Sequence, residues 1–491
     1  MSLRLPLNIG TLDKFLFETR EFIQNSDIQA NPFFHLVKPT EENISKYRLY
    51  KPESLLFLTI DTIFFFPRIV IEVLYASAIS IFWSTYKSQS QLATDIPCES
   101  LFLSHYTGAQ SRSDKDVYFE SAIDSPNSYV FYLNHTRENT KQIFAGFKKK
   151  NRTRVFVNAK TLSLLPMLKT QLRQSKVSWA LFKYALCGEG LPVNQRRILL
   201  RGARLQHSRP TLANLILRNR LKTLMFSLRP KRMVLTLEGH AHEAMLIHLR
   251  EEFFPHTQIV AYQHAPLVPS QYNIKRVASM LTSNDLVLSS GSSTKSFFLD
   301  ASLRARIEIL GSPKAKEFKY QIKDESRLRI LLTPEAARNS LIEFAQLARK
   351  LSISIPGALL TIRLHPDTSK KLVRVVKEIL KDCANAQISE LALAADLKSS
   401  HVTIFRSSSA AIEGLAFGSL PIHFELGGSG NLNPLSDTQY SVPAFYEYDG
   451  LVHYLKTLNI SRFNSQEKQK ESFEKFSLYF SKLQKFSDLI C

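Results

Sequence analysis

Cysteine is scarce in this sequence, and its distribution excludes two classes of structure. The 491 residues contain four cysteines, which are Cys98, Cys187, Cys383 and Cys491, and no two of them form a CxxC pair. Such spacing argues against a disulfide framework and against a zinc site made of cysteines. It fits a protein of a reducing compartment.

A long uninterrupted apolar run is also absent. The first residues, "MSLRLPLNIGTLDKF", lack the apolar core and the small-residue cleavage site of a signal peptide. The most apolar tract, Ser54 to Trp83, is interrupted by three charged residues and divided by Pro67, so its charge-free pieces fall short of the roughly 18 residues that a membrane span needs. We expect a bent pair of helices, either buried in the core or lying at a membrane interface, with a true span as the weaker alternative.

Acidic residues are almost missing from one stretch of the chain. Between Lys148 and Arg232 there are 21 lysines and arginines but one acid, Glu189, so this stretch carries +20 of the total charge of +21. Charge this concentrated favours an anionic partner. Because no RNP, KH or zinc-finger signature accompanies it, we expect an anionic membrane surface and no nucleic acid. A merely solvated basic face is the alternative.

The length of the chain and the order of its elements predict two lobes. A chain of 491 residues is too long for one ordinary core, and its 44% apolar and 22% charged residues are typical of globular proteins. After Ser88, short apolar runs alternate with helical patterns, as in parallel α/β architecture. The polar residues 314–327 resemble a linker between two such sets. We therefore predict an α/β protein with two Rossmann-like lobes, and a site in the cleft outside the carboxyl ends of the strands.

The same pattern predicts the boundaries of the units. A long basic helical insertion is expected at about 160–230, inside the first lobe. The units are an N-terminal helical and apolar segment over 1–95, an N-terminal lobe over 96–315, a C-terminal lobe over 325–440 and C-terminal helices over 441–491.

Two predicted strand ends in the second lobe carry residues suited to binding phosphate. "TIRLHP" places His365 at a strand end, where an imidazole can donate a proton or a hydrogen bond to a leaving phosphate, although a structural His-Pro turn is the alternative. "FRSSS" places Ser407, Ser408 and Ser409 between a strand and a helix, where hydroxyls and free N–H groups bind anions. Ordinary N-capping needs only one such serine. Glu413, one turn into that helix, is placed to reach a ribose diol.

A third strand end, in "LTLEGHAHEAMLIH", lies in the first lobe. Glu238 ends the strand, Gly239 makes the turn and a helix follows, so the carboxylate is placed where a general base for an acceptor hydroxyl belongs. His264, at the end of the next strand in "YQHAP", is expected to line the same cleft as Glu238 and Gly239.

The histidines of this stretch also suggest a zinc site, but their spacing argues against one. A zinc-binding HExxH motif needs histidines four apart on one helical face. Here His242 and His248 form HExxxxH, which places them about 240° apart around a helix. We therefore expect no metal at this site.

Together, the Glu-Gly turn, "RLHP" and "SSSAAIEGLAFGSLPI", in this order on two α/β lobes, resemble GT-B enzymes of bacterial surface-polysaccharide synthesis. Relatives by motif are polysialyltransferases, capsule Kdo transferases and CDP-glycerol glycerophosphotransferases. The segments "SLFLSHYTG", "DVYFESAI", "LEGHAHEAMLIHL" and "IVAYQHAP" look closer still to surface-carbohydrate (O-antigen/capsule) biosynthesis proteins. The resemblance covers residues 98 to 430, and Leu237 departs from it because an acidic residue often stands there.

The resemblance implies a role for each matching residue. Glu238 matches the catalytic base, His365 the His-Pro histidine, and Ser407 and Ser408 the phosphate-binding serines. Thr333, at a further strand end, and Arg363, in the same "TIRLHP" as His365, are assigned to the same nucleotide site. The first lobe then binds the acceptor and the second binds the nucleotide sugar.

The expected function is a metal-independent, inverting glycosyltransferase without a cofactor. Its donor is a nucleotide sugar, with a CMP-activated sugar acid favoured, and its acceptor is a glycan or lipid-linked glycan at the cytoplasmic face of the bacterial inner membrane. The alternatives are a CDP-polyol phosphotransferase, a nucleotide-sugar epimerase, and a basic binding protein on an inactive scaffold.

Overall fold

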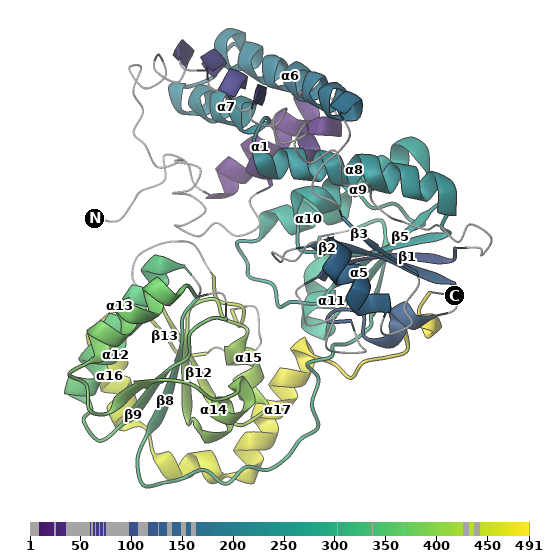
Figure 1. The fold of residues 1–491 in the computed structure, drawn as a ribbon. Coiled ribbons are helices and arrows are strands. Elements are labelled where there is room, and N and C mark those ends of the chain that lie inside the picture. Colours follow the sequence, from purple (N-terminus) through teal and green to yellow (C-terminus); the bar gives the residue numbers. More distant parts are fainter. Residues whose placement is uncertain are drawn as a thin grey trace.

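Two parallel β-sheets, one in each half of the chain, organise the fold (Figure 1). These sheets confirm the predicted α/β architecture with two Rossmann-like lobes. The structure is a computed structural model, and it describes residues 9–23, 26–35, some residues between 59 and 74, 98–106, 116–125, 127–134, 140–148, 154–158, 164–425 except 302, 336 and 367, 432–436 and 442–490.

The N-terminal lobe is built on a seven-stranded sheet in the order β3-β2-β1-β4-β5-β6-β7. Its strands are β1 (Ser100–Tyr106), β2 (Ser128–Asn134), β3 (Val155–Val157), β4 (Arg232–Thr236), β5 (Gln258–Gln263), β6 (Leu286–Ser289) and β7 (Arg306–Ile309). On β1, Leu101 and Leu103 face one hydrophobic core, whereas Phe102 and Tyr106 face another. Both faces of the sheet are therefore covered, which explains why its strands are continuous apolar runs in the sequence.

Short helices connect the strands of this lobe. They are α5 (Thr140–Lys148), α9 (Ala241–Phe253), α10 (Tyr272–Ser279) and α11 (Ser292–Leu299), with a 3-10 turn, η4, at Ser121–Asp124. The helix after the Glu-Gly turn, α9, was predicted, whereas α10 and α11 were not. Both missed helices have only eight residues, too few for a clear apolar period.

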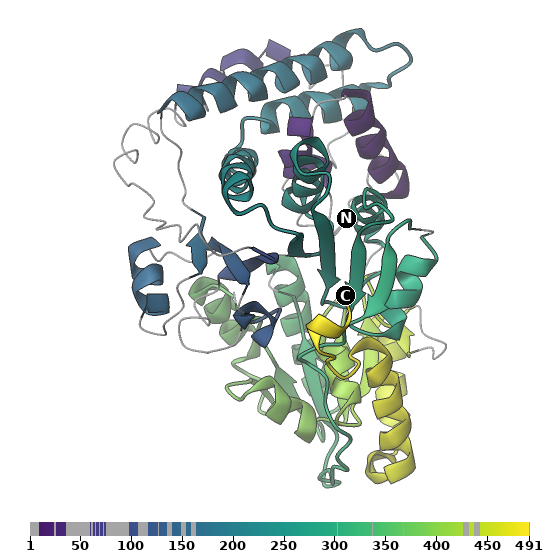
Figure 2. The same cartoon turned by 90° about the vertical axis from the view of Figure 1, so that its right-hand side faces the viewer.

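The basic insertion forms a helical layer over one end of the N-terminal lobe (Figures 1 and 2). It consists of α6 (Leu164–Cys187), α7 (Val193–Leu205) and α8 (Arg209–Leu228). The N-terminal elements α1 (Ile9–Ile23), η1 (Ser26–Ala30) and η2 (Pro32–Phe34) pack against it and share its hydrophobic core. The described N-terminal residues are thus part of this lobe.

Some of the basic charge of the insertion is used inside the protein. The buried Asp27 carboxylate of η1 accepts hydrogen bonds from Arg173 of α6 at 2.6 and 2.8 Å, and Arg218 of α8 lies 3.7 Å from it. In the same layer, Arg276 of α10 pairs with Asp13 of α1. These ion pairs hold the N-terminal elements to the helices behind the sheet.

Part of the predicted apolar tract, 54–83, lies outside the described residues. Those described between 59 and 74 are helical on both sides of Pro67. Within the described part of the chain, no helix has the length and apolar character that crossing a membrane would require.

The C-terminal lobe has a six-stranded parallel sheet in the order β10-β9-β8-β11-β12-β13. Its strands are β8 (Arg329–Thr333), β9 (Leu359–Ile362), β10 (Ala386–Ile388), β11 (Val402–Phe405), β12 (Leu420–Phe424) and β13 (Ala444–Phe445). Its helices are α12 (Arg338–Ser354), α13 (Lys370–Leu380), α14 (Leu393–Ser399), α15 (Ala410–Leu415) and α16 (Tyr448–Thr457). The segment 441–491, for which C-terminal helices were expected, contains α16 and also β13, which pairs with β12 and extends the sheet.

The C-terminal end of the chain returns to the N-terminal lobe. After η5 (Ile460–Asn464), helix α17 (Gln466–Tyr479) leads to a segment that hydrogen-bonds along the first lobe and ends in η6 (Phe486–Asp488). The N–H of Ser481 donates to Ser290 at 3.0 Å, and that of Gln484 donates to Leu310 at 2.8 Å. Gly311 has a φ of +89° and a side chain there would clash with Lys482, so glycine permits this close crossing.

Candidate functional site

The turn after β4 brings Glu238 to the carboxyl end of the sheet. Leu237 is buried and its N–H donates to Tyr262 of β5 at 2.8 Å, which keeps the chain in the sheet up to this residue. Gly239 then turns with a φ of +85°, and a Cβ there would lie 2.8 Å from the backbone nitrogen of Ile274. The positive φ and the close contact with Ile274 both require glycine at position 239, directly after Glu238.

Glu243, in the first turn of α9, holds this turn in place. Its carboxylate is fully buried and accepts the backbone N–H groups of Glu238 at 3.0 Å, Gly239 at 2.7 Å and His240 at 2.8 Å. Burial raises the pKa of Glu243 to about 7, whereas His240 and these N–H groups act to lower it. In the sequence Glu243 stands out only as part of a zinc-like motif, and the signal for its role was its place at N3, the third helical residue, of a capping box that begins at His240.

The Glu238 carboxylate lies between two imidazoles. Oε2 is 3.2 Å from Nε2 of His240, and Oε1 is 3.2 Å from Nε2 of His264. The side chain of Glu238 is 32% exposed, so the carboxylate is held in place yet open to a ligand. The structure therefore brings together the three residues Glu238, Gly239 and His264 that the sequence placed at one strand edge.

His264 is a buried, neutral partner of Glu238. Burial lowers its pKa, the Glu238 carboxylate opposes this, and Lys314 adds to the lowering. Among the described residues its Nδ1 finds no hydrogen-bond partner, so the ring proton belongs on Nε2, where it is donated to Glu238. The Tyr118 ring packs edge-on at 4.6 Å and excludes water from one side.

More histidines surround this group without forming a metal site. His242 stacks on His240 with ring centroids 5.4 Å apart, and His105 lies 5.8 Å from His242. In the described part of the chain, no three histidine, cysteine or acidic residues are arranged to hold a metal ion.

The N-terminal helices support the turn from behind. Asn273 of α10 donates to the carbonyl oxygen of Gly239, and its own amide oxygen accepts a hydrogen bond from Arg20 of α1 at 3.4 Å. Arg20 also contacts the buried His35 imidazole at 2.7 Å. Residues far earlier in the sequence thus fix the position of the turn.

In the C-terminal lobe, Ser407 is tied to a neighbouring loop. Its hydroxyl donates to Glu335 at 2.6 Å, and Arg406 binds the same carboxylate at 3.0 and 3.2 Å. Burial acts to raise the pKa of Glu335, but Arg406, Ser340 and Ser407 lower it below its usual value. The backbone at Ser407 is therefore held rigidly at the carboxyl end of β11, whereas its hydroxyl already has an internal acceptor.

The next two serines have different surroundings. Ser408 accepts the N–H of Ala410 at 3.3 Å in the turn before α15, whereas the N-cap residue itself, Ser409, makes no side-chain capping hydrogen bond. Ser409 points to the other lobe, where its hydroxyl lies 3.4 Å from Nζ of Lys314. Helix α15 has only six residues, so its dipole contributes little to binding an anion here.

Lys314 connects the two halves of the site, although in the sequence it stands out only as part of a polar linker. Its Nζ lies 2.9 Å from the Glu413 carboxylate, and its charge also acts on His264 in the N-terminal lobe. Lys316 lies 4.0 Å from the other Glu413 oxygen. Two lysines therefore stand beside Glu413, and one of them, Lys314, also reaches Ser409. The sequence signal was their position directly after a strand end in "ILGSPKAK".

The remaining predicted residues lie at carboxyl ends of other strands in the C-terminal lobe. Thr333 is buried, and its hydroxyl donates to Ile404 of β11 at 3.3 Å, so it joins two strands. Arg363 follows β9 and binds Asp396 at 2.8 Å. His365 is exposed just beyond, in a turn in which its carbonyl accepts the N–H of Thr368 at 2.9 Å.

Comparison with known proteins gives a likeness of fold only. No protein-family model matches the sequence, and no curated protein matches it. A UDP-GlcNAc 2-epimerase of Neisseria meningitidis matches with 10% identity and a TM-score of 0.42, over 77% of this chain and 94% of that one. The glycosyltransferase SnogD of Streptomyces nogalater matches with 13% identity and a TM-score of 0.41, over 78% of this chain and 95% of that one. Anabaena HepE, solved with UDP-glucose, matches with 10% identity and a TM-score of 0.43, over 78% of this chain and 95% of that one.

Proposed function

We propose that the chain is an inverting GT-B glycosyltransferase that uses a nucleotide sugar and needs no metal. The observation that carries this proposal is the Glu238 carboxylate, partly exposed at the end of β4 and held between His240 and His264. A carboxylate with fixed orientation and open access suits a general base for a hydroxyl group. The proposed acceptor is a growing glycan, free or lipid-linked, at the cytoplasmic face of a bacterial inner membrane.

The reaction at this carboxylate is a single displacement. Glu238 takes the proton of the acceptor hydroxyl while that oxygen bonds to the anomeric carbon of the donor. The bond from this carbon to the phosphate oxygen breaks, and the electron pair leaves with the nucleotide. His264, neutral with its proton on Nε2, keeps Glu238 oriented throughout by donating a hydrogen bond.

The leaving phosphate is assigned to the second half of the site. Lys314, Lys316 and Ser409 supply two positive charges and a hydroxyl, with His365 as the proposed proton or hydrogen-bond donor. Lys314 is paired with Glu413 at 2.9 Å, so an arriving phosphate would replace this carboxylate as its partner. Fixed positive charge near a departing phosphate lowers the barrier without a metal.

A panel of nucleotides tests the donor. We expect CMP to raise the melting temperature more than CDP, UDP or GDP does, because a CMP-activated sugar acid is the favoured donor. A shift with UDP alone would replace this donor with a UDP sugar. If no nucleotide shifts the melting temperature, the nucleotide-sugar proposal itself is wrong.

A product assay separates the three reactions that such a site can catalyse. Transfer to a glycan acceptor, unaffected by EDTA, is the expected result. A product that carries phosphate from CDP-glycerol would identify the phosphotransferase instead. Conversion of the donor sugar to an epimer without any acceptor would identify an epimerase.

Replacing Lys314 with methionine tests the phosphate half of the site. We expect nucleotide affinity to fall about 10- to 100-fold, since a hydrogen bond to a charged group contributes roughly 1.5–3 kcal/mol. Isothermal titration measures this affinity. Lys319→Met is the matched control, since Lys319 is an exposed lysine of the same linker, and it should bind nucleotide as the wild type does. Equal losses in both variants would rule out a specific role for Lys314.

A further inference from the structure

Helix α6 exposes a regular row of apolar side chains. Leu165, Leu172, Trp179 and Leu186 follow one another at intervals of seven residues, and Leu168 lies beside them. Their exposed fractions are between 41% and 66%. An interval of seven residues returns a helix almost to the same direction, so these side chains share one face. The face is long, apolar and open to solvent.

A second apolar face lies next to it, on the helical residues between 59 and 74. Ile63, Phe66, Val70, Ile71 and Leu74 are 52–64% exposed. The ring of Phe66 is 6.2 Å from that of Trp179, and Gln171 of α6 donates to the carbonyl of Val73 at 3.2 Å. These contacts place the two helical segments side by side, so the ten exposed side chains form one surface, which we call the apolar cap.

Packing among the described residues of the lobe does not account for the apolar cap. The opposite sides of the same segments already supply the core: Phe65, Val177 and Leu181 are buried there. Phe65 stacks on Phe182 at 4.4 Å. An exposed continuous apolar surface of this kind marks a site of interaction with a partner or a membrane.

A row of lysines identifies the kind of partner. Lys169, Lys176 and Lys183 are exposed and also follow at intervals of seven, about 40° around α6 from the apolar row. The 24 residues of α6 include no acid. Leucine and tryptophan flanked by lysine is the composition of a helix that lies in the interface of an anionic bilayer. A second copy of the protein is a poorer partner for this face. Its own α6 would bring more lysines and no carboxylate to pair with them.

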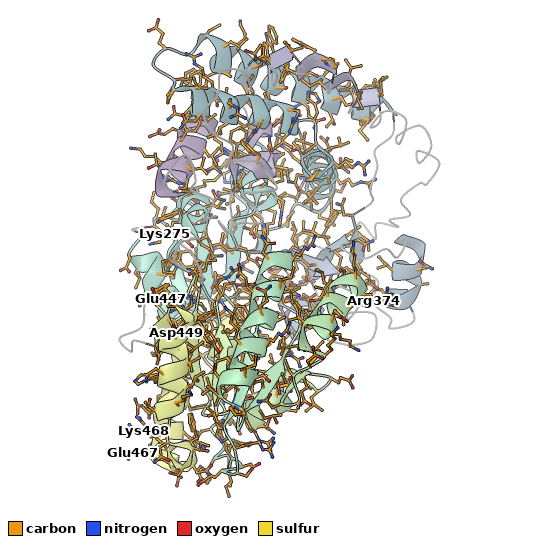
Figure 3. All side chains as sticks on the ribbon, turned by 90° about the vertical axis from the view of Figure 1, so that its left-hand side faces the viewer. Lys275, Arg374, Glu447, Asp449, Glu467 and Lys468 are labelled. Carbon is orange, nitrogen blue, oxygen red and sulfur yellow. The ribbon has the colours of Figure 1, made fainter. Side chains whose placement is uncertain are left out.

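We propose that the apolar cap docks on an anionic lipid bilayer. The leucines and Trp179 enter the boundary between headgroups and acyl chains, while the three lysines meet lipid phosphates. Figures 1 and 2 place α6 at the end of the molecule remote from the C-terminal lobe. In Figure 3, Glu447, Asp449 and Glu467 lie on the C-terminal lobe, away from that end. Docking in this orientation keeps these acids off the membrane and leaves the nucleotide lobe in water.

Flotation with vesicles tests this surface. The full chain is expected to bind vesicles of phosphatidylglycerol and phosphatidylethanolamine, and to bind phosphatidylcholine vesicles much more weakly. The double variant Leu172→Glu, Trp179→Glu should bind the anionic vesicles at least about tenfold more weakly. Burying the side chain of one leucine or tryptophan in the bilayer strengthens binding by about tenfold or more. The matched control is Ile353→Glu, Leu391→Glu, two apolar residues of the C-terminal lobe that are 74% and 62% exposed, and it should bind like the wild type.

Tryptophan emission gives an independent measurement. The chain has two tryptophans, so Trp83→Phe leaves Trp179 as the single reporter. Its emission should shift to the blue with anionic vesicles, and Lys169→Gln, Lys176→Gln, Lys183→Gln should abolish the preference for anionic lipid.

Each other outcome overturns the proposal. Absence of vesicle binding by the wild type, or equal binding by the Leu172, Trp179 double variant, would show that the cap is not a membrane surface. A concentration-dependent dimer in sedimentation velocity, lost in the same double variant, would identify a second copy as the partner. The docking proposal is separate from the chemistry at Glu238, so nucleotide binding is measured on the same variants and reveals a failure of either proposal alone.

Discussion

Replacing Glu238 with glutamine is expected to lower the rate of glycosyl transfer by about 10²- to 10⁴-fold, which is the usual contribution of a general base. Glutamine keeps the size of the side chain and an oxygen that accepts the His264 hydrogen bond, but it takes up no proton. The measurement is the single-turnover rate with saturating donor and acceptor. Nucleotide affinity should be unchanged, since Glu238 lies in the other lobe from the proposed nucleotide site.

The control for this substitution is His242→Gln. His242 lies in the same group of rings but stacks on His240, and neither hydrogen bond that joins Glu238 to His240 and His264 involves it. We expect its effect on the rate to be less than about tenfold. Full activity of Glu238→Gln would remove the mechanism proposed for this site, and a matching loss in His242→Gln would point to a structural effect.

Replacing Glu243 with alanine is expected to lower the free energy of unfolding by about 3 kcal/mol, since buried N–H groups left without an acceptor each cost roughly 1–3 kcal/mol. The three residues of the turn, Glu238, Gly239 and His240, lose their common acceptor together. Transfer activity should fall as well, because the turn that orients Glu238 is no longer held. Denaturant unfolding followed by circular dichroism measures the stability.

Glu251→Ala is the matched control for Glu243→Ala. Glu251 lies on the same helix, and its side chain is 40% exposed with a 3.4 Å contact to His248. A half-exposed pair of this kind contributes less than about 1 kcal/mol. Similar losses in the two variants would show that the carboxylate of Glu243 has no special role in the turn.

The sequence was most informative where a pattern depends on local chemistry. Strands buried on both faces are continuous apolar runs, so β1, β4 and β8 were recognisable. The position of Glu238 followed from a strand end and a glycine, and the structure agrees with both. Strands β10 and β13 were missed because they have three and two residues and depend on their neighbours for pairing.

Partners that come from distant parts of the chain were not predictable. Lys314 looked like one charge among many in a polar linker, and only the fold places it beside Ser409 and Glu413. Likewise, nothing local to Ser407 indicates that its hydroxyl donates to Glu335, 72 residues earlier. Their assignment to a nucleotide site stays a prediction.

The return of the chain to its first lobe has a mechanical consequence. The backbone passes between the lobes at 310–328 and again through α17 and residues 480–482, where Gly311 packs against Lys482. The two connections are in contact at this point, where the N–H of Ser312 donates to the carbonyl oxygen of Ser481 at 3.0 Å, so together they form one hinge of two chain segments. Any change in the angle between the lobes must therefore bend both segments together. The distance between Glu238 in the first lobe and Ser409 in the second then depends on how far these two segments bend.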